Sequence, residues 1–492
     1  MRNDHARHGR MASPARRLAG PAAALAIGLL SGCAVNPATG SSMLSLVSES
    51  REIEMGQEFK VQVDQQQGIY DESPELSAYV DSVGQALAAV SERPDLPWSF
   101  QIADEPVVNA FALPGGPIYL ARGLLAHFSS EAEMASVLGH EIGHITARHI
   151  VEAISRQQLA QLGFVAGMLA VPELQPFSNE LGGALGVLFL KFGRDDESQS
   201  DALGFRYMTR LGYDPVEAVT MFQVLDRLRA ESGRDVPEWQ STHPDPGNRV
   251  ADARARVDSA GNPGGIVRTD VYLDRIDGLV WGEDPREGYF QEQRFIHPEL
   301  AFEFTLPEGW EKRNTRQAVL ARSPENDAAF ELTLAQGTPD AAARAFFAQQ
   351  GVDGRGTTRR TVNGLPAVVG TFRASTQSGT LEGLVSFIEH GGNTYRLLGY
   401  APASRIGRHS TSLERTLDSF REVTERRLLD VEPQRIDVVT VEEPMSAERF
   451  LERYPSEAEH ADVLRINGLQ PAEWIEAGTK LKRIVGTGGP TR

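Results

Sequence analysis

The sequence predicts an α+β chain in three parts: a mainly helical first half with a small sheet, an α+β unit with an antiparallel sheet, and a small β-α-α-β unit. Helical spacing of apolar residues dominates 49–92 and 130–257. Short runs typical of strands fill most of 292–428, and 433–486 alternates strand, helix, helix, strand. These three patterns define the predicted organisation.

The N-terminus has the pattern of an export signal. Arg16 and Arg17 precede a short run of small apolar residues, so 1–32 matches a secretory signal peptide. Leu30-Ser31-Gly32-Cys33 resembles the bacterial lipobox, and Cys33 is the chain's single cysteine, which excludes an intramolecular disulfide. We therefore expect a lipid anchor on Cys33 and a polar tether at 33–48. Ala34, and not Asp, follows the cysteine, and by resemblance to lipoprotein sorting rules this favours the periplasmic face of the outer membrane of a Gram-negative-type bacterium. The alternative to a lipid-anchored protein is a plain signal peptide with an unmodified cysteine.

The net charge argues against a nucleic-acid partner, and the hydropathy argues against a membrane-spanning segment. The formal net charge of −18 argues against nucleic acid, which needs clustered Lys and Arg. The apolar segments 162–171 and 181–190 are too short to span a membrane. We expect them to be buried helices, with contact to a membrane surface as the alternative.

The elements of the first domain follow in order. Ser73 and Pro74 are typical of a helix start. A strand is expected at 98–106, and 109–125 has the pattern strand, glycine turn, strand. Ser130 and Glu133 have the spacing of a capping box that opens the next helix. We assign this domain to 49–262, and 263–291 to a connecting segment with one helix, after the Gly- and Pro-rich break at 259–265.

The helix that begins near Ser130 carries the order His-Glu-x-x-His. His140 and His144 are four residues apart, so they share one helix face and both imidazoles can meet one zinc ion. Glu141 lies one residue after His140 on the same helical turn, so its side chain is poorly placed to be a third ligand of the same ion. It can instead take a proton from a zinc-bound water, which predicts a general base.

A third ligand must come from elsewhere in the chain. On a continuous helix His149 would lie about 140° round from His144, which excludes it. Glu197 and Asp201 again share a helix face, so Glu197 can bind zinc while Asp201 accepts the outer N–H of a ligating histidine. The alternative is an acidic helix start stabilised by the helix dipole.

His243 lies before Pro244, where an extended backbone is favoured over a helix core. Two site roles are open. His243 could stabilise the oxyanion formed when water attacks a peptide carbonyl, or it could occupy the fourth zinc position and keep the site latent. A plain loop residue is the alternative.

The sequence indicates less about the function of the last two parts. The 292–428 unit resembles PsbP-like domains, and we find no chemistry in it. The 433–486 unit resembles a LysM domain, a module that binds N-acetylglucosamine in peptidoglycan, through Asn467-Gly468-Leu469 and the ending at 477–484. Its first loop, 442–446, departs from the usual Gly-Asp-Thr. Glycan binding and a packing role both remain open.

Four segments together resemble the zinc metallopeptidase family of the CaaX prenyl endopeptidases and its bacterial periplasmic lipoprotein branch. They are 109–116, 140–144, 197–201 and 242–249. The resemblance implies a zincin-type domain of the gluzincin class, with one zinc per chain on two histidines and a glutamate. It also implies that an added strand of substrate binds at Asn109, Ala110 and Phe111, with Arg249 a further substrate contact.

The expected function is a zinc-dependent endopeptidase of the cell envelope that hydrolyses unfolded or misassembled outer-membrane proteins. The alternative is a peptidoglycan-tethered assembly chaperone with little proteolytic activity. The intact Glu141 argues against it, because a structural zinc site needs no general base. Cleavage of peptidoglycan cross-links is a third option, suggested only by the LysM-like part.

Overall fold

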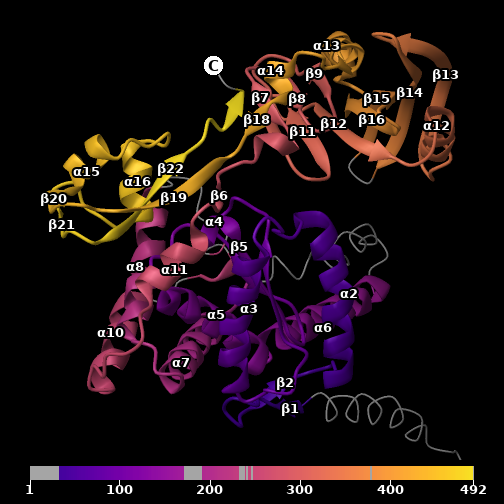
Figure 1. The fold of residues 1–492 in the computed structure, drawn as a ribbon. Helices are drawn as coiled ribbons and strands as arrows, with labels where there is room; N and C mark the ends of the chain where they lie inside the picture. Colours follow the sequence, from indigo (N-terminus) through magenta and orange to yellow (C-terminus); the bar gives the residue numbers. More distant parts are fainter. Residues whose placement is uncertain are drawn as a thin grey trace, which may run out of the picture.

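The structure is a computed structural model that describes residues 33–170, 191–231, 239, 242–244, 248–376 and 379–490. The expected signal peptide (1–32) and the apolar segment 181–190 lie outside these residues, and 162–171 is described only as backbone up to Ala170. Within the described part of the chain, no helix combines the length and apolar character needed to cross a bilayer. The three-part α+β fold class is confirmed (Figure 1).

The first part is mainly helical and lies at the bottom of Figure 1, in indigo to magenta. Its elements are β1 (Cys33–Val35), β2 (Ser42–Leu44), α2 (Glu49–Gln67), α3 (Pro74–Ala89), β3 (Ser99–Ala103), β4 (Ala110–Ala112), β5 (Pro117–Ala121), α4 (Arg122–Leu125), α5 (Glu131–Thr146), α6 (His149–Ala170), α7 (Arg194–Arg210), α8 (Val216–Glu231), α10 (Arg249–Ser259), α11 (Thr269–Ile276) and β6 (Val280–Trp281).

Side-chain caps fix where the main helices begin. The hydroxyl of Ser73 accepts a hydrogen bond from the Leu76 N–H, and Pro74 opens α3 as predicted. Ser130 accepts from the Glu133 N–H at 3.1 Å, which starts α5 at the predicted residue. The Glu133 carboxylate accepts from the Ser129 N–H, so the predicted capping box is not closed on Ser130 itself. All residues of α5 are buried, so this helix forms the centre of the domain.

The small sheet has the order β3-β5-β4, with β3 parallel and β4 antiparallel to β5. β4 is therefore an edge strand, as predicted. The turn between β4 and β5 contains Gly115 at φ 73° and Gly116 at φ 140°, where an L side chain would be strained. A Cβ at Gly115 would also stand 2.7 Å from the Ile53 Cα of α2, so the turn packs directly on that helix.

Residues 33–48 are not the free polar tether that their composition predicts. β1 and β2 pair as an antiparallel hairpin, and Met43 and Val47 are buried. The Leu46 N–H donates to the Ser155 hydroxyl of α6 at 3.0 Å. Apolar burial and this hydrogen bond together dock the segment on the domain.

The second part, orange in Figure 1, is built on an antiparallel sheet of order β10-β11-β12-β16-β15-β14-β13 and a smaller sheet of order β17-β9-β8-β7. Its elements are η3 (Pro285–Glu287), β7 (Tyr289–Gln291), β8 (Arg294–His297), β9 (Phe302–Thr305), β10 (Glu311–Asn314), β11 (Ala318–Arg322), β12 (Ala329–Ala335), α12 (Pro339–Phe347), β13 (Val352–Val362), β14 (Leu365–Thr376), β15 (Gly379–His390), β16 (Asn393–Pro402), α13 (Ile406–Asp418), β17 (Arg421–Glu422) and α14 (Arg426–Leu429).

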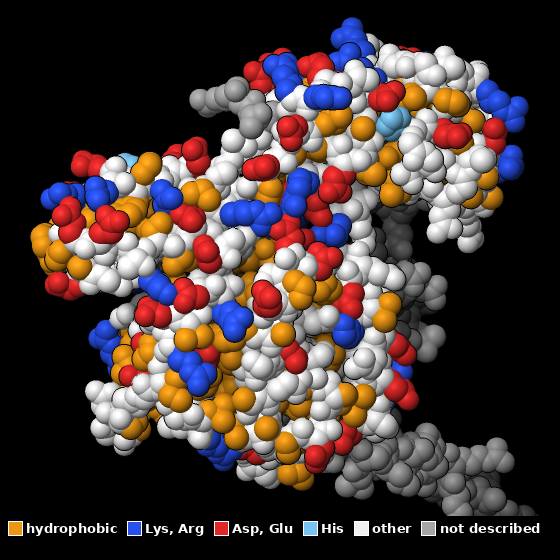
Figure 2. Space-filling model, viewed as in Figure 1, with side chains coloured by type: hydrophobic (Ala, Val, Ile, Leu, Met, Phe, Trp, Pro, Cys, Tyr) orange, Lys and Arg blue, Asp and Glu red, His pale blue; other side chains and the backbone are white. Residues whose placement is uncertain are grey.

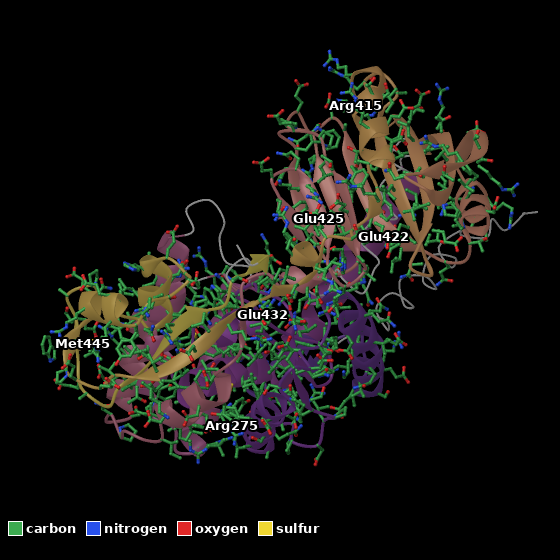
Figure 3. The ribbon with its side chains drawn as sticks, turned by 45° about the horizontal axis from the view of Figure 1, so that its top comes forward. Arg275, Arg415, Glu422, Glu425, Glu432 and Met445 are labelled. Carbon is green, nitrogen blue, oxygen red and sulfur yellow. The ribbon has the colours of Figure 1, made fainter. Side chains whose placement is uncertain are left out.

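The C-terminal module, yellow in Figure 1, has the predicted β-α-α-β order with short extra strands. Figure 3 shows Met445 at its outer end and Glu432 where the chain leaves the second part. Its elements are β18 (Val431–Glu432), β19 (Gln434–Thr440), β20 (Met445–Ser446), α15 (Ala447–Arg453), α16 (His460–Ile466), β21 (Trp474–Ile475), β22 (Lys480–Val485) and β23 (Gly489–Pro490).

The connecting segment and the C-terminal module are not separate from the first part. Tyr272 and Ile276 of α11 lie in the same buried cluster as α5, together with Ile466 and Ile484 of the module. β6 of the connecting segment pairs with β19, which gives a sheet of order β22-β19-β6. The boundaries expected at 262 and 433 therefore do not mark where the packing ends.

Ion pairs join the second part to the first. Figure 2 shows basic and acidic side chains gathered where the upper part meets the rest of the molecule. Arg316 of the second part lies 2.6 Å from Asp104, and Asp104 also accepts from Arg122 at 2.7 Å. On the same junction Arg286 of η3 pairs with Glu72. The junction is thus held mainly by charge, in contrast to the apolar contact with the C-terminal module.

Candidate metal centre

Close packing of α5 on α7 brings the predicted ligands together. Gly204 of α7 faces Gly139 of α5, and a Cβ on Gly204 would stand 2.8 Å from the His140 backbone N. Gly143 of α5 faces the Ser200 backbone in the same way. Glycines at this crossing let the two helix backbones approach, so the side chains of α7 reach the histidine face of α5.

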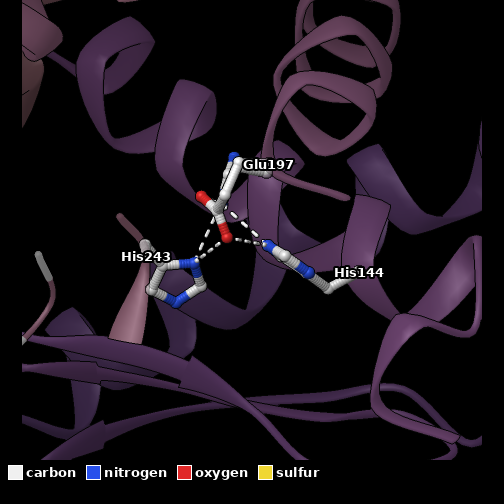
Figure 4. A group of neighbouring side chains, drawn as sticks. His144, Glu197 and His243 are labelled. Carbon is white, nitrogen blue, oxygen red and sulfur yellow. Dashed lines mark hydrogen bonds and ion pairs between the residues drawn. The ribbon is translucent and has the colours of Figure 1, made fainter. Parts of the chain in front are cut away.

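Four buried side chains converge at this crossing: His140, His144, Glu197 and His243. The Nε2 atoms of His140 and His144 are 3.0 Å apart, and each lies 3.5 Å from a Glu197 carboxylate oxygen. The His243 Nδ1 lies 3.1 Å from Glu197 Oε1 (Figure 4). The same nitrogen lies 3.3 Å from His140 Nε2. Three predicted ligands and the predicted loop histidine therefore share one centre.

The spacing fits a tetrahedral metal ion. Zinc ligands at about 2.0–2.2 Å from the ion are about 3.3–3.6 Å from one another in a tetrahedron, close to the distances between these four groups. Glu197 Oε2 is buried and, among the described residues, accepts no hydrogen bond, although the Arg249 guanidinium lies 3.6 Å away. Two imidazole nitrogens and a carboxylate facing one point are a donor set that zinc prefers.

Burial keeps the histidines neutral, as metal ligands must be. It lowers the pKa of His140, lowers that of His144 further, and lowers the pKa of His243 to about 4. Burial also raises the pKa of Glu197 to about 7, against the opposing effect of His140 and Arg249. A buried carboxylate of this kind is stabilised by a cation, which a metal ion would supply.

Asp201 orients His140, as predicted. Its Oδ1 accepts a hydrogen bond from His140 Nδ1 at 2.9 Å, which leaves the Nε2 lone pair directed at the centre. Burial alone would raise the pKa of Asp201, but the charge of Arg249 and the bond from His140 hold it below its usual range. Asp201 is therefore a carboxylate that fixes the tautomer of His140.

Arg249 does not have the open position expected of a substrate contact. Its guanidinium donates to Asp201 Oδ2 at 3.0 Å and lies between the rings of Phe222 and Trp239, at 4.5 and 4.7 Å from their centroids. Arg249 is also buried. Its charge is used inside the site, where it pairs with the Asp201 carboxylate and stabilises it.

Glu141 lies beside the centre without joining the ligand group. It is buried, and its Oε1 lies 3.7 Å from His243 Nε2 and 3.3 Å from the indole N–H of Trp239, which donates to it. Burial raises the pKa of Glu141 above its ordinary value. A carboxylate with a raised pKa is better suited to take a proton from water near neutral pH.

Trp239 and His243 form one helical turn over the site. The His243 N–H donates to the Trp239 carbonyl at 2.9 Å, and the two rings stack with centroids 4.9 Å apart. The Trp239 N–H also donates to the Val108 carbonyl at 3.3 Å, just before β4. This turn therefore covers the general-base candidate and touches the approach to the edge strand.

The predicted substrate residues lie along β4, and their side chains face inward. Ala110 and Phe111 are buried, and the Phe111 ring stacks on Tyr119 at 5.0 Å. Asn109 is also buried, and its Oδ1 accepts no hydrogen bond among the described residues. Substrate contact at β4 would therefore involve the strand backbone and the Asn109 amide, while Ala110 and Phe111 shape the strand.

Sequence reasoning missed two residues of the site, Trp239 and His149. Trp239 lies four residues before His243, a helical spacing that could have linked the two. His149 was excluded on the assumption that α5 continues past it. The helix ends at Thr146, Arg148 adopts φ 62°, and His149 Nδ1 returns to 3.1 Å from His144 Nδ1.

Two helix-borne histidines, a glutamate from a neighbouring helix and a free glutamate inside the first motif form the pattern that is typical of metal-dependent peptidases. Residues 74–257 match the profile of peptidase family M48. This match covers 184 of the 492 residues, from α3 to α10.

Curated relatives agree with this family. The chain is 38% identical over 162 residues to the mitochondrial metalloendopeptidase OMA1 of Arabidopsis thaliana, covering 32% of this chain and 31% of the relative. It is 30% identical over 326 residues to the beta-barrel assembly-enhancing protease of Yersinia pestis, covering 61% and 65%. The Escherichia coli protein of that name is 28% identical over 327 residues, covering 61% and 66%. The chain thus spans less than two thirds of each relative.

Among solved structures, PsbP from the cyanobacterium Synechocystis aligns with 26% of this chain and 91% of its own, at 17% identity and a TM-score of 0.23. The PsbP-like and LysM-like resemblances of the last two parts therefore stay predictions.

Proposed function

We propose that this chain is a zinc-dependent endopeptidase of the bacterial envelope that cleaves unfolded or misassembled outer-membrane proteins. The observation that carries the proposal is the convergence of His140, His144 and Glu197 beside the separate carboxylate of Glu141. The names of the beta-barrel assembly-enhancing proteases support outer-membrane substrates. A lipid anchor on Cys33 would keep the enzyme at the membrane where such substrates insert.

In this mechanism His140, His144 and Glu197 would hold one zinc ion, which would supply Lewis acidity to the substrate carbonyl and to the attacking water. Glu141 takes a proton from that water and passes it to the leaving nitrogen. The backbone of β4 binds the substrate as an added strand, which suits extended or unfolded chains. Asn109 would add a polar contact at the start of that strand.

The closed state of the site supports regulated activity. His243 Nδ1 lies within the ligand group, where it can fill the fourth position. Trp239 covers Glu141. We propose that this turn must move before a substrate enters, so that the enzyme is latent until a substrate or partner displaces it.

The test compares the full-length chain with its Glu141→Gln variant in zinc content and in cleavage of an unfolded outer-membrane β-barrel protein. We expect about one zinc per chain in both, because Glu141 is not a ligand. Cleavage should fall at least about 10²-fold in the variant, since the general base is lost. A chain that binds no zinc even after reconstitution contradicts the proposal. Zinc binding with equal turnover in both chains would contradict the role of Glu141, and binding of the substrate without cleavage would favour the chaperone alternative.

A further inference from the structure

His149 is buried and in contact with a proposed metal ligand, yet it is not a ligand itself. Its Nδ1 lies 3.1 Å from the Nδ1 of His144, the ring nitrogen that points away from the centre. The two zinc-binding histidines therefore have different outer partners: His140 faces the carboxylate of Asp201, and His144 faces a second imidazole.

A backbone break brings His149 to this position. α5 ends at Thr146, and Arg148 takes the left-handed conformation with φ 62°, which an L side chain rarely adopts. Contacts of Arg148 hold the break in place: its Nε donates to Glu52 Oε2 at 2.9 Å and its Nη2 to the Val47 carbonyl at 3.0 Å. Strain that is held by buried contacts next to a site indicates a positional role for the residue it places.

The hydrogen-bond network fixes which nitrogen of His149 carries a proton. The Ala38 N–H donates to Asn36 Oδ1 at 2.9 Å, so the amide of Asn36 turns its Nδ2 toward Gln199 and donates to Gln199 Oε1 at 3.1 Å. That oxygen also lies 2.7 Å from His149 Nε2, which must therefore be the protonated nitrogen. His149 Nδ1 is then a bare acceptor.

A bare Nδ1 on His149 determines the state of His144. At 3.1 Å the two Nδ1 atoms share one proton, which must belong to His144. The Nε2 of His144 is then unprotonated and directed at the centre, 3.5 Å from Glu197 Oε1. The Ser200 hydroxyl, 3.3 Å from His149 Nδ1, is free to rotate and can add a second donor to that atom.

We propose that His149 is a positioning residue that accepts the Nδ1 proton of His144 and so presents its Nε2 to the metal, with Gln199 and Asn36 holding His149 in the required tautomer. The inference rests on the metal site of the proposed function. It also gives the segment after Cys33 a part in the outer shell of that site, through Asn36. Outer partners of this kind contribute about 10–100-fold to metal affinity.

The experiment measures zinc affinity of the full-length chain by competition with a chelator, in the wild type and in His149→Leu and His149→Asn. We expect His149→Leu to lose about 10–100-fold in affinity. His149→Asn should restore most of it, because its Oδ1 takes the place of the imidazole Nδ1. His127→Leu is the matched control: it replaces another buried histidine of the same domain and should leave affinity unchanged.

Two outcomes overturn the proposal. Equal zinc affinity in wild type and His149→Leu would show that His149 does not position His144, and equal losses in the leucine and asparagine variants would show that only packing matters. A wild type without zinc would instead contradict the proposed function. If His149→Leu fails to fold, ¹⁵N chemical shifts of His144 in the metal-free wild type decide: we expect the proton on Nδ1, and a proton on Nε2 contradicts the relay.

Discussion

At the scale of single residues, His243 has two chemically different nitrogens near two partners. Nδ1 lies in the ligand group, and Nε2 lies 3.7 Å from Glu141. The sequence left two site roles open, an oxyanion donor or a fourth ligand. A nitrogen whose lone pair meets the other ligands at 3.1–3.3 Å favours the ligand role in this closed state.

We therefore expect His243→Ala to raise the cleavage of an unfolded substrate, because the fourth position becomes free for water. The measurement is the initial rate of cleavage at equal zinc content, with Glu141→Gln/His243→Ala as the inactive control. A fall of about 10²–10³-fold in turnover would instead identify His243 as the oxyanion donor.

How much of the site could be predicted depended on helix spacing. His140, His144, Glu197 and Asp201 were found because residues four apart share a helix face, and no fold was needed for that. His149 was missed because the same rule assumes an unbroken helix. The break at Arg148 depends on Glu52 and Val47, which no local pattern connects to it.

At the scale of elements, the crossing of α5 and α7 sets the distance between the histidines and Glu197. Gly204 is the tightest point, because a Cβ there would meet the His140 backbone N at 2.8 Å and the Gly139 carbonyl carbon at 3.0 Å. Backbone atoms cannot move aside as a side-chain end can. The two helices would have to separate.

Gly204→Ala should therefore destabilise the domain by about 1–3 kcal/mol, the usual range for overpacking, and weaken zinc binding. Thermal unfolding and chelator competition measure the two effects. Gly407→Ala is the matched control, since that helical glycine of α13 has nothing within 4 Å of its added Cβ. Unchanged zinc affinity in Gly204→Ala would mean that the crossing does not control the ligand spacing.

Elements were predictable where caps or apolar alternation marked them. Ser73, Ser130 and the strands of the second part fall in this class. β13 was not expected, because its sequence is polar and rich in Gly, Thr and Arg, and it lies at the edge of the sheet. A strand that buries few side chains leaves little pattern in the sequence.

At the scale of the whole molecule, the C-terminal module completes the core of the first part. Lys482 of β22 is fully buried, and its Nζ donates to the carbonyls of Ala126 and Phe128 at 3.1 and 2.7 Å, just before α5. Burial lowers the pKa of Lys482 to about 7, against the charge of Glu133 in the first turn of α5. Lys482 is so far along the chain from Ala126 and Phe128 that no local sequence pattern predicts their contact.

Lys482→Met should lower the thermal midpoint of the first part, because two buried carbonyls lose their donor at a cost of about 1–3 kcal/mol. Lys480→Met is the matched control two residues away: Lys480 pairs with the exposed Asp274 and should shift stability by less than about 0.5 kcal/mol. Equal midpoints for the two variants would show that the module is only attached to the peptidase domain.

The burial of Lys482 also bears on the order in which the protein is made. A ribosome adds this lysine long after the metal ligands on α5 and α7, so the carbonyls before α5 stay without their donor until the C-terminal module has followed. Completion of the core beside α5 is thereby tied to completion of the polypeptide.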